Sequence, residues 1–397
     1  MTRHRVLDAY SRSLDAMLLE VVGPFLEKRA AALDRGWWER HQVGGPHVRI
    51  KLHAPEPRLN ELIEELRSNV AGWMAAHPTS PDDCSPQQAA ASQHVAGQNG
   101  ATADLGRRND VVLEVAPEEE RLSAAESGAQ QLLDDFRRAS GPLALLILAA
   151  DAPRLETLLR LFLTLALYIG RGSYPNGSVS FKSHWERFAA TSSSEDTLAR
   201  IEASYRRNRE RLLIVIEEVR HGWQADRFRN DPLLEGWWRL LDATSRQAAS
   251  VLEERDGVID HAATTKEILD MRAELFTRHV RRPSAFVETM WSDEKFLTLV
   301  QYDKRFQRPR ALVNLLYVFA ASLGVGPLEK MALCYHAFRV VEETCACDLS
   351  DLLRRNMTTV VEQQAHRLAE AGAEQNPKTP ADDTAAPRST GADSSPT

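Results

Sequence analysis

Hydrophobic side chains recur at spacings of three and four over most of the chain, a periodicity typical of amphipathic helices. Near the N-terminus this spacing predicts helix over residues 5–33 and 55–76, and further along over residues 124–169. Beyond residue 194 we expect helix almost throughout, over 198–223, 232–254, 264–279, 283–303, 309–323 and 327–368. Several of these ranges begin with proline, which is favoured in the first turn of a helix.

Residues 47–52 follow a different pattern, in which apolar and basic side chains alternate strictly. This alternation predicts a strand with one apolar face and one cationic face, and the cationic face carries His47, Arg49 and Lys51. An aromatic run and a turn-prone run come directly before it. The three segments together predict a β-hairpin.

Residues 110–115 predict a further strand, and residues 179–188 are a candidate for another. We therefore expect an α+β fold that is predominantly helical and contains a small antiparallel sheet. Residues 77–106 are rich in Ala, Ser, Gln, Pro and Gly and hold three acids but no Lys or Arg, which predicts a disordered insertion. Residues 370–397 lack apolar spacing and predict a tail. The remainder, 1–369, is expected to form a single domain.

The charge balance narrows the classes of partner. Among 397 residues there are 49 Lys and Arg against 56 Asp and Glu, a net charge of -7. Bulk binding of nucleic acid usually requires a strongly basic domain. The N-terminus lacks the apolar stretch of a signal peptide, and no apolar run is long enough to cross a bilayer. We expect a cytoplasmic protein that binds neither nucleic acid nor a membrane.

Motifs for common cofactors are missing from the sequence, including the Gly-rich dinucleotide fingerprint, the P-loop and the zinc-hydrolase and serine-hydrolase motifs. The cluster of Cys334, His336, Cys345 and Cys347 matches no standard zinc spacing. On one continuous helix Cys334 and Cys345 would lie roughly 16 Å apart, too far to share an ion. We expect neither a metal nor a cofactor, and interpret these cysteines as small core residues plus an exposed pair.

Three segments together resemble a known family. The hairpin Trp37-Trp-Glu-Arg-His with Gly45-Pro-His-Val-Arg-Ile-Lys51 is similar to its Gly-Pro-His-Leu-Arg-Leu-Arg strand and the aromatic strand before it. Val115-Ala-Pro-Glu-Glu-Glu-Arg121 resembles its Pro-Glu-x-Glu-Arg-Tyr-Gly-Gly segment, and Phe181-Lys-Ser-His-Trp-Glu-Arg-Phe188 its Ser-His-x-Glu-x-Phe element. The family comprises the C-terminal elimination domain of lantibiotic dehydratases and the stand-alone thiopeptide-type bacteriocin biosynthesis proteins. The resemblance spans about residues 35–343 and implies the elimination-domain fold for the domain at 1–369.

The resemblance implies an enzyme, a lyase or cyclase, that acts on a ribosomally made precursor peptide by one of two chemistries. In one, a glutamylated Ser or Thr loses glutamate and becomes a dehydroamino acid, which requires a base and cations that hold the leaving carboxylate. In the other, two dehydroalanines undergo a formal [4+2] cycloaddition. Loss of water and of the leader peptide then gives a pyridine.

The late helix separates the two chemistries. Eliminating members carry histidines and Asn-Arg-Leu-Gly there, whereas this chain reads Tyr317-Val-Phe-Ala-Ala-Ser-Leu-Gly324. The family's Asn-Arg falls on Ala321 and Ser322, and its histidines fall on Tyr317 and Phe319. Serine cannot replace a guanidinium, and phenylalanine is neither acid nor base. These changes favour the pyridine-forming branch over stand-alone glutamate elimination.

The resemblance assigns catalytic roles to Arg121, His184, Glu186 and Tyr317. Each has a structural alternative: Arg121 could pair with a neighbouring glutamate, His184 could be a surface or capping residue, and Tyr317 could be a core aromatic. On a strand, His184 and Glu186 would share one face.

Substrate binding is assigned to Lys182 and to the basic side chains of residues 47–51, which are His47, Arg49 and Lys51. Those three could instead form only the solvated side of the hairpin. The expected partners are the precursor peptide, with its leader and dehydrated core, and a separate glutamylating dehydratase subunit. A peptide-binding subunit without catalysis is an alternative of another class.

Overall fold

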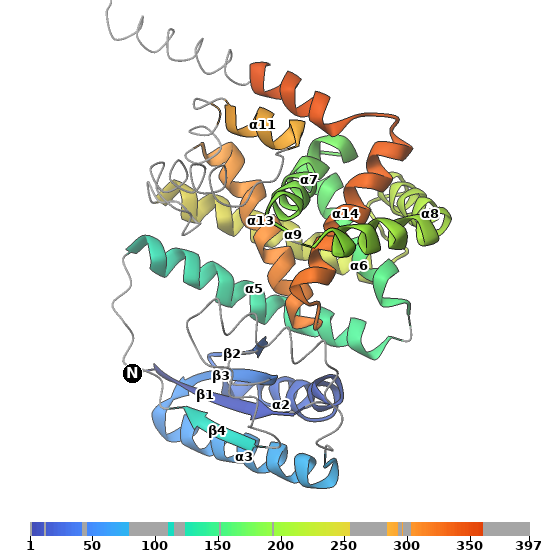
Figure 1. Ribbon diagram of the computed structural model, residues 1–397. Coiled ribbons are helices and arrows are strands. Elements are labelled where there is room, and N and C mark those ends of the chain that lie inside the picture. The colour runs from blue at the N-terminus through green and yellow to red at the C-terminus, as the bar shows by residue number, and fades with distance from the viewer. Residues whose placement is uncertain are drawn as a thin grey trace, which may run out of the picture. The chain divides into compact units, whose positions relative to one another are not determined.

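The computed structural model (Figure 1) describes residues 2–11, 13–41, 46–78, 110–114, 124–150, 152–192, 194–254, 284–292, 296 and 303–359. Met1–Leu353 forms one compact unit, and the second unit, Arg354–Thr397, is described only as far as residue 359. Most of the predicted insertion, the residue Arg121, the predicted boundary at 369 and the predicted tail lie outside the described residues.

A four-stranded antiparallel sheet forms one part of the compact unit. Its order is β2-β3-β1-β4, with the bounds β1 Thr2–Tyr10, β2 Arg35–His41, β3 His47–Pro55 and β4 Asp110–Glu114. The pairing places Asp8 of β1 opposite Arg49 of β3, and Trp37 of β2 opposite Lys51. The predicted hairpin is therefore present as β2 and β3.

The apolar face of the sheet packs on the helix α3, Glu56–Ala76. Val48, Ile50 and Leu52 are fully buried on this face, as their alternation with basic residues predicts. The side chains that α3 contributes recur at helical spacing and are also buried: Leu59, Leu62, Ile63, Leu66 and Val70. Burial of apolar area on both sides of this contact stabilises the sheet, at about 25 cal/mol per Å².

The prediction of helix from residue 5 is wrong for residues 5–10, which belong to β1. Both sides of this strand are covered, so that Leu7, Asp8 and Ala9 are all fully buried. The alternation that identifies a half-exposed strand is therefore missing. Helix begins only with α1, Leu14–Met17, and continues through a π turn into α2, Gly23–Lys28.

Most of the other described residues of the unit are helical (Figure 1), so the predicted α+β class with a helical majority is confirmed. Their bounds are α5 Ala124–Ala149, α6 Arg154–Ile169, α7 Tyr174–Thr191, α8 Glu195–Gln224, α9 Pro232–Glu254, α11 Ala285–Ser292, α13 Lys304–Ser322 and α14 Pro327–Thr344. The helix α5 contacts both β2 and α9 and so lies between the sheet and the other helices. No helix in the described part of the chain is long and apolar enough to cross a membrane.

The helix α6 is the centre of the helical part, because it contacts α7, α8, α9, α13 and α14. Between residues 157 and 167 every side chain except that of Arg160 is buried, as expected of a helix surrounded on nearly all sides. Its closest neighbour is α7, where a Cβ atom on Gly177 would overlap the carbonyl oxygen of Ala166. Only glycine allows the two backbones to approach so closely.

Residues 179–188 are not a strand but part of α7. The buried side chains Tyr174, Phe181 and Trp185 recur at helical spacing along it. Successive helical residues are rotated by about 100°, so His184 and Glu186 lie about 200° apart and do not share a face. A second correction concerns α14, which ends at Thr344, so that a turn at residues 345–348 interrupts the continuous helix predicted over 327–368.

Candidate functional site

Three helices bring a tyrosine, a histidine and a cysteine together. The hydroxyl oxygen of Tyr317 on α13 lies 3.1 Å from Nδ1 of His184 on α7 and 3.3 Å from Sγ of Cys334 on α14. The rings of His184 and Tyr317 meet edge to face, with centroids 5.1 Å apart. Both side chains are half-buried, whereas Cys334 is fully buried.

The hydrogen bonds of His184 determine which ring nitrogen carries the proton. Nδ1 lies 2.9 Å from the carbonyl oxygen of Ser180, one helical turn earlier. A carbonyl oxygen can only accept, so Nδ1 is the protonated nitrogen and Nε2 keeps its lone pair. Burial, the largest cause, acts together with the nearby cations Lys330, Arg187 and Arg310 to lower the pKa of His184 to about 4, against the opposing effect of the Ser180 hydrogen bond. The imidazole is therefore neutral at pH 7.

Tyr317 is held as a phenol. Burial raises its pKa well above the ordinary value, and the neighbouring Cys334 acts in the same direction. The ammonium of Lys330 lies 4.9 Å from the centroid of the Tyr317 ring, but burial decides the direction of the shift. Burial also raises the pKa of the Cys334 thiol to about 12, so it is not a nucleophile at neutral pH. The pair can accept a proton at His184 Nε2 and donate one from the phenol.

Two other predicted site residues of α7 lie elsewhere. The Lys182 ammonium is buried and donates to a carboxylate oxygen of Glu342 at 2.6 Å, and it lies 5.3 Å from the ring centroid of Phe338. Glu342 also accepts from the backbone N–H of Leu349, so this ion pair fastens α7 to the end of α14. Glu186 is on the opposite flank of α7 from His184.

The predicted cationic face of β3 exists, but it is not a simple solvated surface. Arg49 donates two hydrogen bonds to the carboxylate of Asp8, at 2.9 and 2.7 Å, and Asp8 is fully buried. His47 is also fully buried, and its Nε2 lies 3.6 Å from the same carboxylate. Lys51 lies over the ring of Trp37, 5.3 Å from its centroid. Asp8, His47, Arg49 and Lys51 form a polar layer of the sheet that is distinct from the His184–Tyr317 pair.

A family model now decides what this chain is. The model described as "Lantibiotic biosynthesis dehydratase C-term" matches residues 6–341. The chain belongs to this family. The match runs from the middle of β1 to the last turn of α14, so the resemblance inferred from three segments is confirmed over nearly the whole compact unit.

Two solved structures share the fold of this lantibiotic dehydratase C-terminal family member. "Pyridine synthase, TbtD, from thiomuracin biosynthesis" is 21% identical, with a TM-score of 0.64, and the match covers 86% of this chain and 98% of that one. TsrL is 18% identical, with a TM-score of 0.65, and the match covers 89% of this chain and 98% of that one. A search among curated proteins finds no match. At these identities the likeness concerns the fold.

The late helix of the family is α13, and the structure shows what its changed residues do. Phe319 is fully buried and stacks on Trp237, with ring centroids 5.1 Å apart, so it is a core residue. At the end of the helix the resemblance places the family's arginine at Ser322. In this chain a guanidinium from β2 lies at that position instead. Arg40 of β2 donates to the carbonyl oxygen of Ser322 at 2.6 Å and pairs with Asp15.

Sequence reasoning missed Asp8, Ser180 and Lys330, which complete the two polar groups. Asp8 could have been found by treating residues 2–10 as a strand and pairing it with β3, because its carboxylate then faces Arg49. Ser180 contributes only its backbone carbonyl, which no side-chain pattern reveals. Among the described residues, no three His, Cys, Asp or Glu side chains are grouped so that they could hold a metal ion.

Proposed function

We propose that this protein is an enzyme that matures a ribosomally made peptide, closing a pyridine ring by formal [4+2] cycloaddition of two dehydroalanines with release of the leader peptide. One observation carries the proposal: a neutral imidazole, His184, lies in hydrogen-bond contact with the phenol of Tyr317 at 3.1 Å. Two further findings support the proposal. The chain belongs to the lantibiotic dehydratase C-terminal family, and its fold is similar to that of a pyridine synthase. The substrate is a precursor peptide that a separate dehydratase has already modified.

The pair suits the proton movements of this reaction. One dehydroalanine amide must become its iminol tautomer, which moves a proton from the amide nitrogen to the carbonyl oxygen. His184 Nε2 accepts the amide proton, Nδ1–H passes a proton to the Tyr317 oxygen, and the phenol gives its own proton to the substrate oxygen. One proton leaves nitrogen, one reaches oxygen, and the charge of the pair is unchanged.

Ring formation then depends on position more than on charge. Two carbon–carbon bonds join the two dehydroalanines, after which water leaves from the former iminol carbon and the leader peptide leaves from the adjacent α-carbon. Holding two distant residues of one chain in contact supplies much of the rate. In the reverse transfer, His184 Nε2–H protonates the departing hydroxyl, the Tyr317 hydroxyl returns its proton to Nδ1, and the Tyr317 oxygen takes up a ring C–H proton, which restores the tautomer that the Ser180 carbonyl favours. The second ring C–H proton is lost to solvent, and the leader amide nitrogen takes one proton from solvent as it leaves.

Stand-alone glutamate elimination is the second candidate, and a specific observation favours it. Lys330, Arg187 and Arg310 all lie close enough to His184 to lower its pKa, and cations near a base could hold a leaving glutamate carboxylate. This reaction also needs a base, which His184 would supply. It requires no second dehydroalanine.

The test is to incubate the purified protein with a dehydroalanine-containing precursor, and separately with a glutamylated precursor, and to weigh the products. Release of intact leader together with a core that absorbs in the ultraviolet supports the cyclase. Loss of glutamate from the second peptide supports elimination in its place, and binding without any change of mass overturns both. Arg121→Ala and His184→Ala are compared with the wild type, and full activity in both variants would remove them from the site.

A further inference from the structure

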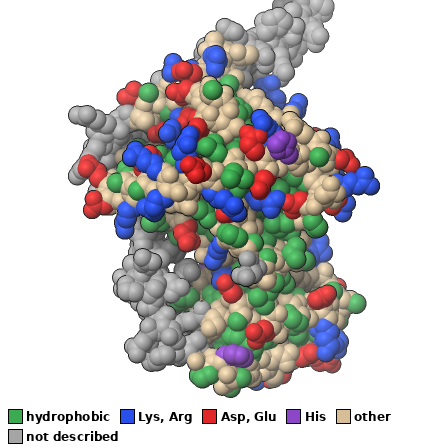
Figure 2. All heavy atoms as spheres, turned by 90° about the vertical axis from the view of Figure 1, so that its right-hand side faces the viewer, with side chains coloured by type: hydrophobic (Ala, Val, Ile, Leu, Met, Phe, Trp, Pro, Cys, Tyr) green, Lys and Arg blue, Asp and Glu red, His purple; other side chains and the backbone are tan. Residues whose placement is uncertain are grey.

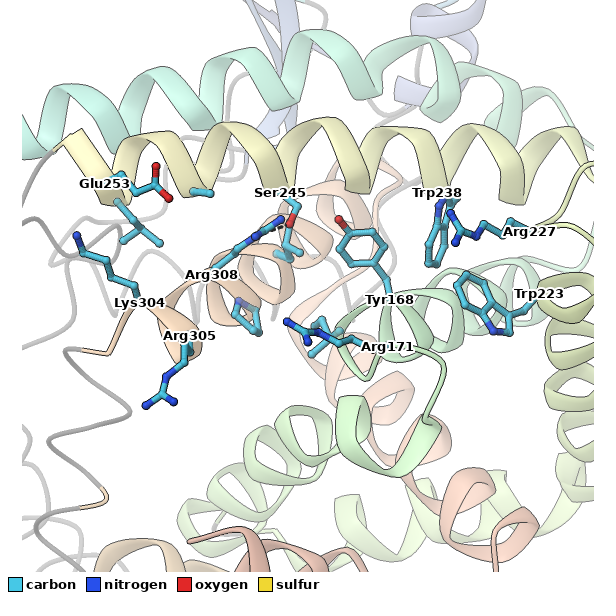
Figure 3. A pocket seen from close by; sticks show the side chains of 15 residues that line it. Tyr168, Arg171, Trp223, Arg227, Trp238, Ser245, Glu253, Lys304, Arg305 and Arg308 are labelled. Carbon is cyan, nitrogen blue, oxygen red and sulfur yellow. Dashed lines mark hydrogen bonds between the residues drawn. The ribbon is translucent and has the colours of Figure 1, made fainter. Parts of the chain in front are cut away.

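A second site is present away from the His184–Tyr317 pair, as a pocket of about 670 Å³ between helices (Figure 3). Its walls are α9, the first turns of α13 and the C-terminal ends of α6 and α8. Neither His184 nor Tyr317 lines it. The volume lies in the range of sites that hold drug-sized ligands.

Basic side chains dominate the rim of this pocket. Among the described lining residues, five are cations (Arg171, Arg227, Lys304, Arg305 and Arg308) and one, Glu253, is an acid. Elsewhere on the helical part, Lys and Arg are intermingled with Asp and Glu over the face shown in Figure 2. A local excess of one charge in a concave site favours a ligand of the opposite charge.

Within the described part of the chain, most of these cations have no carboxylate counter-ion. Arg305 pairs with Asp303, with the closest contact at 2.5 Å, but the other four have no carboxylate partner among the residues that the structure describes. Arg308 donates through Nε to the buried hydroxyl of Ser245 at 2.6 Å, which fixes the side chain and leaves both Nη groups for a ligand. Guanidinium groups held in this way form strong, directional hydrogen bonds with carboxylates.

Aromatic rings form the other part of the wall. Trp223 and Trp238 lie with ring centroids 4.5 Å apart, and Tyr168 meets Trp238 edge to face at 4.8 Å. The guanidinium of Arg227 lies over Trp223, 5.6 Å from the ring centroid (Figure 3). The pocket thus offers a flat apolar surface directly beside its positive charge, which suits a ligand with both apolar groups and anions.

Two of the arginines stand on unfavourable backbone. Arg171, in the turn after α6, and Arg227, in the turn after α8, both have φ of 53°, in the left-handed region. A helix commonly ends in this conformation with glycine, because residues with a side chain are strained there. Strained residues persist where the surrounding structure over-determines them, and they cluster at ligand sites. Here the two strained positions both contribute an arginine to one pocket.

We propose that this pocket binds an acidic peptide segment, a run of Glu or Asp with apolar or aromatic side chains between them. The proposal rests on the proposed function, since the segment would belong to the peptide substrate outside its reacting residues. Unpaired guanidinium groups bind the carboxylates, and the Trp223–Trp238 surface packs on the intervening side chains. A small phosphate-bearing ligand fits less well, because Leu252, Leu312 and the rings occupy much of the wall and favour a ligand with apolar side chains.

The test is isothermal titration of the full chain with a peptide of about ten residues that alternates Glu and Leu, and with its Gln-for-Glu counterpart. We expect the acidic peptide to bind at least about tenfold more tightly than the neutral one. Arg171→Gly removes a guanidinium while keeping the left-handed backbone, and Arg308→Gln removes the fixed one, and each is expected to weaken binding about tenfold. Arg239→Gln, an exposed residue of α9 that pairs with Glu235 outside the pocket, is the matched control.

Several outcomes would overturn the assignment. These are equal binding of the two peptides, no heat of binding, equal losses in Arg239→Gln and Arg171→Gly, or tighter binding of inorganic phosphate or AMP than of the acidic peptide. The binding readout does not depend on the chemistry at His184 and Tyr317. If the peptide fails to bind while the dehydrated precursor is still converted, the pocket assignment falls and the proposed function stands. If the peptide binds but the precursor is not converted, the pocket assignment stands and the proposed function falls.

Discussion

The phenol oxygen of Tyr317 lies 3.1 Å from Nδ1 of His184, although 133 residues separate the two in the chain. The contact joins α7 to α13 next to the central helix α6, which both of these helices contact. It leaves His184 with Nδ1 protonated towards Ser180 and with Nε2 as the basic nitrogen. The function of the protein is therefore testable at single atoms.

Tyr317→Phe removes the hydroxyl and keeps the ring. We expect pyridine formation to slow by about a hundredfold or more, since a positioned general acid or base contributes about 10²–10⁴ to a rate. Mass spectrometry of single-turnover reactions measures this. Tyr174→Phe is the matched control, because its hydroxyl only donates to the carbonyl of Ile216 at 3.1 Å; it should lose about 1 kcal/mol of the free energy of unfolding and no activity. Equal rates for Tyr317→Phe and wild type would exclude the phenol from the reaction.

The pH dependence of the rate reports the protonation state of His184. Burial sets its pKa at about 4, so the imidazole stays neutral as the pH is lowered through 6.5, the ordinary value for histidine. We expect a rate constant that is flat between about pH 7.5 and pH 5.5 and falls only as pH 4 is approached. An inflection near pH 6.5 that disappears in His184→Ala would contradict a neutral, buried base.

The ion pair between Arg49 and Asp8 is expected to be structural. Asp8→Ala leaves Arg49 and the buried His47 without their shared carboxylate, and removing one partner of a buried pair costs about 3–5 kcal/mol. Urea unfolding followed by circular dichroism measures the loss. Glu64→Ala, which breaks an exposed pair with Arg67, should leave the free energy of unfolding almost unchanged, because exposed ion pairs contribute little. If both variants were equally stable, the buried pair would contribute nothing.

His336 gives the protein a pH-dependent stability. Burial lowers its pKa to about 4 in the folded chain, so the unfolded chain binds a proton between about pH 6.5 and pH 4 that the folded chain does not. The stability contribution is complete above pH 6.5 and is lost as the pH falls, by up to about 1.4 kcal/mol for each unit. His336→Phe should therefore lose less stability than wild type between pH 7 and pH 5. A steeper loss in the variant would reverse the sign of this argument.

Local patterns predicted the fold well wherever an element has one buried and one exposed face. The alternation at residues 47–52 identified β3, and the bounds of α9, Pro232–Glu254, agree with the prediction. The pattern failed for β1, because Leu7 and Asp8 point to opposite sides and both are fully buried. A strand covered on both faces gives no alternation.

The sequence predicted which residues belong to the candidate site, but not which of them lie next to one another. Tyr317 and His184 were chosen through a family resemblance, and the structure brings them together, but nothing local to either one encodes a contact over 133 residues. Grouping Glu186 with His184 required a strand, and the helix of α7 separates them. The ion pair of Lys182 with Glu342 depends on how α7 packs on α14, which is a tertiary fact. The catalytic role of Arg121, which lies outside the described residues, stays a prediction.

The missing side chain of Gly177 sets the position of His184. The α7 backbone contacts the Ala166 carbonyl of α6 directly, so this contact fixes the distance between the two helices. His184 lies seven residues further along α7, about 10 Å along the helix axis. The helix contact at Gly177 therefore determines how close the His184 imidazole comes to α13. A single added methyl group at Gly177 would push α7 away from α6 and lengthen the distance between His184 and Tyr317. We therefore expect tolerance to substitution at Gly177 to be limited by the alignment of His184 with Tyr317.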